Sequence, residues 1–293
     1  MSTHHLRCKL AAMAEARTVT ALVLGAITRD LQAGSESSPG GVVHYAGRAF
    51  AALRARTRVV TRVREADAAE LLAPLVAAGV EICALPSAST TTYANDYSGS
   101  EDRHDLLATS DPIGPDDLPA SWRSADAIHL GPLHRDDIRA ETLATLSGFT
   151  GIDLQGLVRL AGEHGTRLAA NPELKDHLAH VNVAKASEEE LAVLLEDRSL
   201  EAFRSAHGLD ELLVTRGERG ALVVTRSGVT EIATPRVPRR FPVGAGDVFL
   251  AAYLYARASG RSPSEAGGFA AQRSAAHVEH GLAGASGRGE AGP

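Results

Sequence analysis

The chain has 293 residues, 44% of them hydrophobic and 23% charged, a composition that can bury the core of one large α/β domain. Its net charge is −6 and no block of lysine and arginine follows the pattern of a nucleic-acid-binding stripe, so no nucleic-acid partner is expected. The two cysteines form no ligand or redox spacing, and no apolar stretch approaches the roughly 20 residues of a membrane span. We therefore expect a cytoplasmic protein with no membrane partner.

Strand-like and helical patterns alternate along the chain from residue 19 to residue 285. Short apolar runs typical of strands buried on both faces occur at 21–27, 80–85, 127–133, 151–154, 181–184 and 212–215. Apolar residues at helical spacing occur at 43–56, 66–78, 135–146, 155–165 and 187–195. This alternation predicts an α/β domain with a mostly parallel sheet, preceded by an extension at 1–18 and followed by a flexible tail at 286–293.

Two segments break the alternation. Residues 90–97 are β-prone but polar on both faces and follow a strand without an intervening helix, which predicts an edge strand projecting from the body. Residues 221–233 predict a hairpin at the sheet edge, around Ser227 and Gly228. We expect one domain with a small β lid, built from segments at about 32–45 and 84–103.

The most informative segment is Gly244-Ala245-Gly246-Asp247, which leads into the apolar run 248–256. A Gly-Ala-Gly turn that opens a helix presents backbone N–H groups at the positive end of the helix dipole, where an anion binds well. An aspartate beside that site suits a carboxylate that takes a proton from a hydroxyl attacking a phosphoryl group. The alternative is ordinary turn chemistry, because aspartate is favoured in any first helical turn. The segment therefore indicates a kinase, and the helix behind it should be buried.

Two features near the first strand indicate contacts with a substrate. Asp30 follows the strand at 21–27, and a carboxylate beyond a strand end can accept hydrogen bonds from two vicinal hydroxyls. Gly40 and Gly41 precede the helix at 43–56 and would let a polyhydroxy substrate approach bare backbone. A solvated loop aspartate and a flexible glycine loop are the structural alternatives.

Two further segments follow strands in the second half of the chain. Ser187 and Glu190 form a Ser-x-x-Glu capping box before a helix, and a role of Glu190 near a metal is the functional alternative. Thr215, Gly217 and Gly220 form either a simple turn into the hairpin or a loop that lines a nucleotide pocket. No Walker A, Gly-x-Gly-x-x-Gly, His-Glu-x-x-His or Gly-x-Ser-x-Gly motif is present, so those rival chemistries have no support.

Taken in order, these segments resemble the ribokinase-like PfkB family of carbohydrate and nucleoside kinases, from about Val19 to Gly281. The residues 244–249 resemble the C-terminal signature of that family, and Pro39-Gly40-Gly41 resembles its di-glycine motif. Residues 187–190 stand where the family has Asn-x-x-Glu, and residues 215–220 match its Thr-x-Gly-x-x-Gly motif. One such motif is a weak signal, whereas four in the right order are a strong one.

The resemblance implies a three-layer α/β/α sandwich with a small β lid, and transfer of the γ-phosphoryl group of ATP, with Mg²⁺, to a hydroxyl of a small polyhydroxy substrate. It also implies roles for individual residues. Asp247 would be the base and Gly244, Ala245 and Gly246 the anion hole; Asp30, Gly40, Gly41, Asn95 and Asp153 would hold the acceptor; Lys185, Thr215, Gly217 and Gly220 would contact the nucleotide; and Glu190 would act on the metal through waters.

Within the family, residues 151–159 resemble the Asp-x-Gln-Gly-x-x-Arg segment of inositol-kinase-type members. A sugar, a cyclitol or a related polyol is therefore the expected acceptor, with nucleosides and aminosugars left open. Phe241-Pro242-Val243 lacks the acidic residue of the family's monovalent-cation site, and Ser187 replaces an asparagine. A non-catalytic sugar- or nucleotide-sensing protein is the alternative from another class, although Asp247 is intact. An open lid edge could also pair with a second copy in a homodimer.

Overall fold

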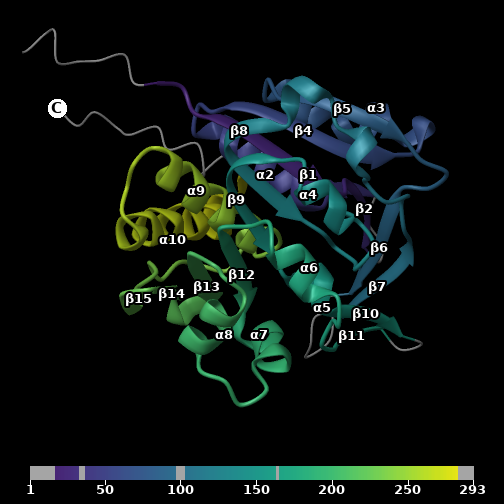
Figure 1. Ribbon diagram of the computed structural model, residues 1–293. Coiled ribbons are helices and arrows are strands. Elements are labelled where there is room, and N and C mark those ends of the chain that lie inside the picture. Colours follow the sequence, from purple (N-terminus) through teal and green to yellow (C-terminus); the bar gives the residue numbers. More distant parts are fainter. Residues whose placement is uncertain (1–16, 33–36, 97–102, 163–164, 283–293) are drawn as a thin grey trace, which may run out of the picture.

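The computed structural model describes residues 17–32, 37–96, 103–162 and 165–282 (Figure 1). At its centre is a nine-stranded sheet in which all neighbouring pairs from β13 to β5 run parallel, and the two pairs at the β15 edge run antiparallel. In spatial order its strands are β15 (Gly228–Ile232), β14 (Ala221–Thr225), β13 (Glu211–Thr215), β12 (Val183–Ser187), β9 (Ser147–Asp153), β8 (Ser124–Gly131), β1 (Thr20–Gly25), β4 (Arg56–Val63) and β5 (Glu81–Pro86).

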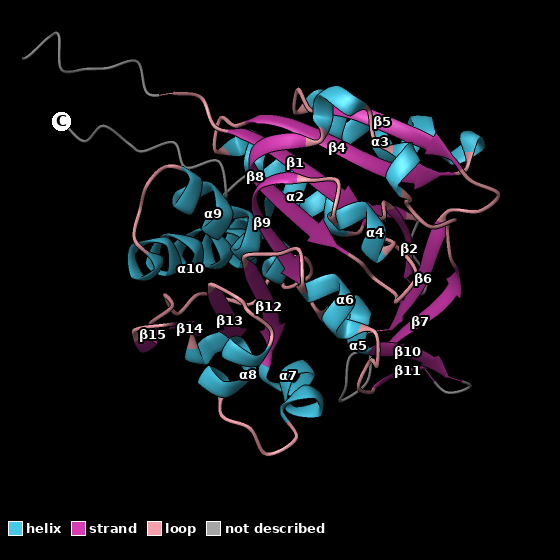
Figure 2. Cartoon of the chain, viewed as in Figure 1, coloured by secondary structure: helices cyan, strands magenta, loops and turns pink. Residues whose placement is uncertain are grey.

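Helices cover both faces of this sheet (Figure 2). Successive side chains point to opposite faces, so that in β1 Ala21 and Val23 belong to one core and Leu22 and Leu24 to the other. The first core is covered by α2 (Val42–Ala52), α3 (Glu65–Ala77), α9 (Ala245–Ala258) and α10 (Pro263–His280). The second is covered by α4 (Ala140–Leu143), α5 (Gln155–Val158), α6 (Leu174–Leu178), α7 (Glu188–Leu195) and α8 (Leu200–Ala206). The expected three-layer α/β/α sandwich is confirmed.

Helix α9 lies at the centre of one layer, in contact with α2, α10, β8 and β9. Every residue from Asp247 to Leu254 is buried, as the apolar sequence predicts. Tyr253, the largest fully buried side chain, donates its hydroxyl proton to Oε2 of Glu211 at 2.6 Å. This packing fixes the body of α9, at whose N-terminus the Gly-Ala-Gly turn lies.

A separate four-stranded sheet forms the lid, in the order β3 (Ser38–Gly40), β2 (Thr28–Gln32), β6 (Thr91–Asp96) and β7 (Arg103–Ala108). It differs in extent from the segments expected at 32–45 and 84–103, because it begins at residue 28 and reaches residue 108. Residues from Val42 onward belong to α2, and residues up to Pro86 belong to β5 of the main sheet. Strand β6, expected at an edge, lies between β2 and β7. A homodimer through the lid stays a prediction.

Three expected elements differ from the structure. The helix expected at 155–165 ends at Val158, and the chain then forms a hairpin of β10 (Arg159–Gly162) and β11 (Gly165–Leu168) that contacts β7 of the lid. The helix expected at 43–56 ends at Ala52, and strand β4 begins at Arg56 after a short turn. The helix expected at 135–146 is reduced to α4. The hairpin predicted at 221–233 is present as β14 and β15, and short 3₁₀ turns occur at η1 (Pro115–Asp117), η2 (Ala120–Trp122) and η3 (Gly217–Arg219).

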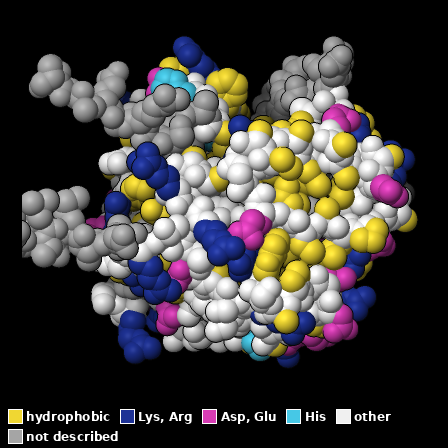
Figure 3. Space-filling model, turned by 90° about the horizontal axis from the view of Figure 1, so that it is seen from above, with side chains coloured by type: hydrophobic (Ala, Val, Ile, Leu, Met, Phe, Trp, Pro, Cys, Tyr) yellow, Lys and Arg dark blue, Asp and Glu magenta, His cyan; other side chains and the backbone are white. Residues whose placement is uncertain are grey.

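The expected N-terminal extension and C-terminal tail lie outside the described residues, apart from residues 17 and 18. Within the described residues no helix is long and apolar enough to cross a membrane. On the face seen from above, basic and acidic side chains are interspersed among uncharged ones (Figure 3).

Candidate active site

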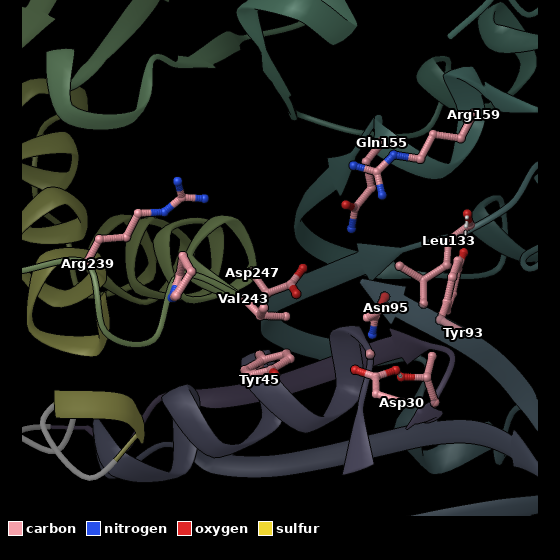
Figure 4. A pocket seen from close by; sticks show the side chains of 14 residues that line it. Asp30, Tyr45, Tyr93, Asn95, Leu133, Gln155, Arg159, Arg239, Val243 and Asp247 are labelled. Atoms are coloured by element: carbon pink, nitrogen blue, oxygen red, sulfur yellow. Dashed lines mark hydrogen bonds between the residues drawn. The ribbon is translucent and has the colours of Figure 1, made fainter. Parts of the chain in front are cut away.

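A cavity of about 240 Å³ lies where the lid, the turn before α9 and the residues around β9 meet (Figure 4). In the figure Asp247 lies between Arg239 on one side and Asp30 and Asn95 on the other. Residues expected in the site that line this cavity are Asp30, Gly41, Asn95, Gly244 and Asp247. The other lining residues are Thr28, Tyr45, Tyr93, Leu133, Gln155, Arg159, Arg239, Pro242 and Val243. Segments up to about 200 positions apart in sequence thus converge on one space.

Asp247 is a buried carboxylate with one unsatisfied oxygen. Its exposed fraction is 7%, and no described group donates a hydrogen bond to Oδ1. Burial, with a further contribution from Asp153, raises the pKa of Asp247 from 3.8 to about 7, although Lys185 and Arg159 oppose the shift. A carboxylate that lines a cavity, with a pKa near neutrality and one oxygen without a hydrogen-bond partner, is suited to accept a proton.

Lys185 and Asp153 form a buried ion pair beside Asp247. Nζ of Lys185 lies 2.7 Å from Oδ2 of Asp153, and Oδ1 of Asp153 accepts a hydrogen bond from the N–H of Gln155 at 3.1 Å. Burial lowers the pKa of Lys185, but the carboxylates of Asp153, Glu190 and Asp247 together outweigh this effect, so that the pKa of Lys185 is raised. Asp153, expected to hold the acceptor, therefore contacts Lys185, expected to contact the nucleotide. The ion pair therefore lies at the boundary between the expected acceptor site and the expected nucleotide site.

The glycines of the turn before α9 are required by close contacts. Gly244 has φ +79°, and a Cβ added there would lie 2.2 Å from Cγ of Tyr45. A Cβ added to Gly246 would lie 2.6 Å from Nζ of Lys185. The turn can therefore pack against both the aromatic ring and the ammonium group, with its backbone N–H groups at the start of a 14-residue helix.

Asp30 lies under the di-glycine segment of the lid. It is 8% exposed, and burial raises its pKa above the usual value. Its Oδ1 accepts a hydrogen bond from the hydroxyl of Thr28 at 2.7 Å. A Cβ on Gly40 would lie 2.1 Å from Oδ2 of Asp30. Gly41 has φ +81°, and a Cβ there would lie 2.5 Å from the carbonyl oxygen of Ala26. Gly40 therefore lets the backbone pass close to the Asp30 carboxylate, and Gly41 caps α2. The expected approach of a substrate to these glycines stays a prediction.

Two tyrosines give the cavity flat walls. Tyr93 from β6 donates its hydroxyl proton to the carbonyl of Leu133 at 3.4 Å, and burial raises its pKa to about 12. Tyr45 lies in the first turn of α2, below Asp247 in Figure 4. Asn95 from β6 and Gln155 from α5 add polar groups to the same space. Such a mixture of ring faces and hydrogen-bonding groups suits a small polyhydroxy ring.

Glu190 has the capping role that its sequence predicts. Its side chain accepts a hydrogen bond from the N–H of Ser187 at 2.9 Å, and its own N–H donates to the Ser187 hydroxyl oxygen at 3.2 Å. Its other oxygen pairs with Arg159 at 3.1 Å. Through Arg159, which lines the cavity, Glu190 is connected to the site.

Thr215, Gly217 and Gly220 lie one strand further along the sheet. Thr215 pairs in register with Ser187, so it lies at the same carboxyl-end edge of the sheet as Lys185. Thr215, Gly217 and Gly220 do not line the cavity. Gly217 has φ +57° with open space around it, whereas a Cβ on Gly220 would lie 2.0 Å from the carbonyl oxygen of Ile232. Close packing against Ile232 thus explains why residue 220 is a glycine, whereas Gly217 has open space around it.

A divalent metal fits the site only in part. Among the described residues no group of three or more His, Cys, Asp or Glu side chains is arranged to hold a metal ion. Glu190 uses both oxygens in protein contacts. Because Mg²⁺ retains several waters and commonly binds through substrate phosphates, Glu190 fits a water-mediated contact to an ion that arrives with the donor.

Five lining residues were not singled out from the sequence: Thr28, Tyr45, Tyr93, Leu133 and Arg239. Tyr45 follows Gly41 by one helical turn, a spacing that could have suggested it. Gln155 and Arg159 belong to the segment that resembled inositol kinases, but they carried no assigned role. Nothing in the sequence distinguishes Arg239 from its neighbours Arg236 and Arg240.

Known structures share this fold. The chain matches a pyrophosphate-dependent kinase in the ribokinase family, complexed with a pyrophosphate analogue and myo-inositol, with a TM-score of 0.78 and 22% identity over 88% of this chain and 95% of the other. It matches ribokinase from Thermotoga maritima with a TM-score of 0.71 and 18% identity over 91% and 95%. It matches fructokinase from Vibrio cholerae O395, bound to fructose, ADP and calcium, with a TM-score of 0.73 and 19% identity over 91% and 96%.

No curated protein matches the chain in sequence. The sequence profile of the pfkB family of carbohydrate kinases, in contrast, matches residues 21–288, nearly the whole chain. That range includes the di-glycine segment, the Asp153 and Lys185 pair and the turn before Asp247. The chain belongs to the pfkB family of carbohydrate kinases and is a phosphotransferase of that kind.

Proposed function

We propose that this chain transfers the γ-phosphoryl group of ATP to a hydroxyl of a sugar, a cyclitol or a related polyol. The observation that carries the proposal is the placement of Asp247: a buried carboxylate with a free oxygen, at the head of α9, in the same cavity as Asp30 and Asn95. No other described residue combines a near-neutral carboxylate pKa with a place at a helix N-terminus beside this cavity.

In the proposed reaction the acceptor hydroxyl oxygen attacks the γ-phosphorus of the donor. An oxygen–phosphorus bond forms, the bond from the γ-phosphorus to the β,γ-bridging oxygen breaks, and ADP leaves. Asp247 takes the hydroxyl proton. The N–H groups of Gly244 and Gly246 stabilise the negative charge on the transferring group, as donors fixed in advance do at low cost, while the N–H of Ala245 donates to the carbonyl of Pro242 at 3.3 Å.

The chain's own charges arrange the two substrates. Asp30 and Asn95 would hold neighbouring hydroxyls of the acceptor on the lid side, between the two tyrosine walls. Lys185 would move between Asp153 and a donor phosphate, since Gly246 leaves its ammonium group directly beside the turn. Mg²⁺ would neutralise the donor phosphates, with Glu190 in contact through water.

A cyclitol is the first acceptor to test. Gln155 and Arg159, from the segment that resembles inositol kinases, line the cavity opposite Asp30, so a ring with hydroxyls on several sides would find polar partners around it. The myo-inositol bound in the structure of the pyrophosphate-dependent kinase supports the same choice. Nucleosides and aminosugars of the same family are the alternatives.

Pyrophosphate is the second candidate donor. Arg159 and Arg239 line the cavity on either side of Asp247 (Figure 4). Nζ of Lys185 lies close to the turn, since a Cβ on Gly246 would lie 2.6 Å from it. Cationic groups on two sides of one cavity, with a third beside the turn, could hold a short polyphosphate that brings no nucleoside of its own. The relative that uses pyrophosphate supports this second candidate.

The test is a panel of cyclitols, sugars, aminosugars and nucleosides, each incubated with ATP or with pyrophosphate in the presence of Mg²⁺. Acceptor-dependent formation of ADP, or of a phosphorylated acceptor from pyrophosphate, supports the kinase and identifies its donor. Binding of a panel member without any turnover, with either donor, would instead support a sensing protein.

A further inference from the structure

The turn that carries the proposed anion hole lies on a half-open part of the surface. Val243, which precedes it, is 36% exposed, and Phe241 is 50% exposed. Locally, the N–H of Ala245 reaches the carbonyl of Pro242 at 3.3 Å. Donors aimed at a transferring phosphoryl group must be held closely, because a displacement of about 1 Å can cost roughly 100-fold in rate. Support from other elements is therefore needed.

Helix α10 supplies this support with two side-chain donors. Nε2 of His277 lies 2.8 Å from the carbonyl oxygen of Val243, and the hydroxyl of Ser274 donates to the carbonyl of Ala245 at 2.9 Å. A carbonyl oxygen can only accept, so Nε2 of His277 carries the proton. The two donors are three residues apart on one face of the helix, and they contact the residues that flank Gly244.

Tyr45 closes the other side of the turn. Its ring occupies the space where a Cβ on Gly244 would be. The rings of Tyr45 and His277 meet edge to face, with centroids 5.7 Å apart and planes at 72°. Gly244 thus lies against an aromatic ring that is itself in contact with the imidazole that holds Val243.

His277 is built for support rather than for contact with a substrate. It is 2% exposed and does not line the cavity. Burial lowers its pKa, and Arg48 lowers it further, although the hydrogen bond to Val243 opposes the shift. The ring is therefore neutral near pH 7, and its Nδ1 has no hydrogen-bond partner among the described residues.

We propose that His277 is a positioning residue, which holds the Val243 carbonyl so that the N–H groups of the following turn face the transferring phosphoryl group. The role rests on the kinase function proposed above. The hydrogen bond itself does not, so its effect on the turn can be measured without any substrate.

The activity test compares His277→Leu, which removes the donor at similar volume, with His277→Gln, which keeps an N–H donor at similar reach. The Leu variant should lose about 10- to 100-fold in kcat while the KM of the acceptor stays near the wild-type value. The Gln variant should recover most of that loss. His280→Leu is the matched control on the same helix, since His280 is exposed and pairs with its neighbour Glu279, and it should behave as wild type.

The substrate-free test is hydrogen–deuterium exchange of the amides at 244–248. Exchange should be faster in His277→Leu and near wild type in His277→Gln and His280→Leu. Unchanged exchange and kcat in the Leu variant, or equal damage from Leu and Gln, overturns the proposal. If the Leu variant does not fold, the Gln variant decides: wild-type exchange in it supports the donor role and fast exchange overturns it. A wild-type chain inactive on every substrate, with the expected exchange pattern, contradicts the kinase function alone.

Discussion

Nζ of Lys185 lies 2.7 Å from Oδ2 of Asp153, and this ion pair is enclosed directly beside the carboxylate of Asp247. Asp153 raises the pKa of Asp247 and Lys185 lowers it, so the pair acts on the proposed base in two opposite directions. Removing either partner should therefore have a distinct effect on the pH dependence of the enzyme.

Lys185→Met should shift the acidic limb of kcat/KM to higher pH, because it leaves two carboxylates without their cation. Asp153→Asn should shift the same limb to lower pH, because Lys185 then acts on Asp247 without opposition. Breaking the buried pair should also destabilise the fold by about 3–5 kcal/mol. Lys175→Met, at an exposed position of α6, is the control. Limbs that move in the same direction in both variants would contradict this account of the pair.

Asp247→Asn should lower kcat by about 100- to 10,000-fold, the usual contribution of a general base. Because asparagine keeps the shape of the side chain, donor and acceptor should still bind. Calorimetric titration of donor and acceptor, beside steady-state rates, checks both parts. Near-normal turnover in this variant would remove Asp247 from the mechanism.

The rate of the wild-type enzyme should fall as the pH drops below about 7, because the base must be deprotonated and its pKa is raised to about 7. The same shift predicts a loss of stability with rising pH. The native carboxyl holds its proton up to about pH 7 and the unfolded one only to 3.8, so the native state binds more protons between these values. Urea unfolding from pH 4 to 8 should show stability falling in the wild type and a smaller fall in Asp247→Asn.

Gly244→Ala should reduce kcat and stability together. The new Cβ would stand at 2.2 Å from the ring of Tyr45, on a backbone with φ +79°, so the turn must move. Gly268→Ala in α10 is the matched control, since its Cβ meets nothing within 4 Å and the change should stabilise the helix by about 0.5–1 kcal/mol. Thermal unfolding and steady-state kinetics of the two variants separate these outcomes.

Replacement of K⁺ by tetramethylammonium should leave the rate unchanged. The carbonyl of Val243 already accepts a hydrogen bond from His277, and the carbonyl of Val278 accepts two, from the N–H groups of Arg240 and Phe241. The segment 241–243 offers no carboxylate either. A clear stimulation by K⁺ would show that a cation still binds next to the turn.

Local sequence patterns predicted helices and strands well where the pattern was continuous. They failed where contacts with distant parts of the chain determine the local structure. The apolar run of α9 and the capping box of Ser187 and Glu190 were both recognisable. Strand β4 was not predicted because arginines interrupt its apolar residues. The structure shows that one of them, Arg62, pairs with Asp117 in a segment far along the chain, which the sequence pattern does not reveal. A helix was expected after Val158 because the spacing of apolar residues there fits a helix as well as a strand. In the structure the segment forms a hairpin, and its second strand contacts β7 of the lid.

The sequence by itself determined the family and the order of its motifs, and it predicted which residues bind an anion, accept a proton or contact hydroxyls. Only the tertiary structure decided how strongly each acts. The pKa of Asp247 depends on burial and on Asp153, 94 positions earlier, and the turn beside it depends on His277 and Tyr45 from two other helices. Electrostatic and packing forces act over a few ångströms of space, and a sequence records no distance between residues that the fold brings together.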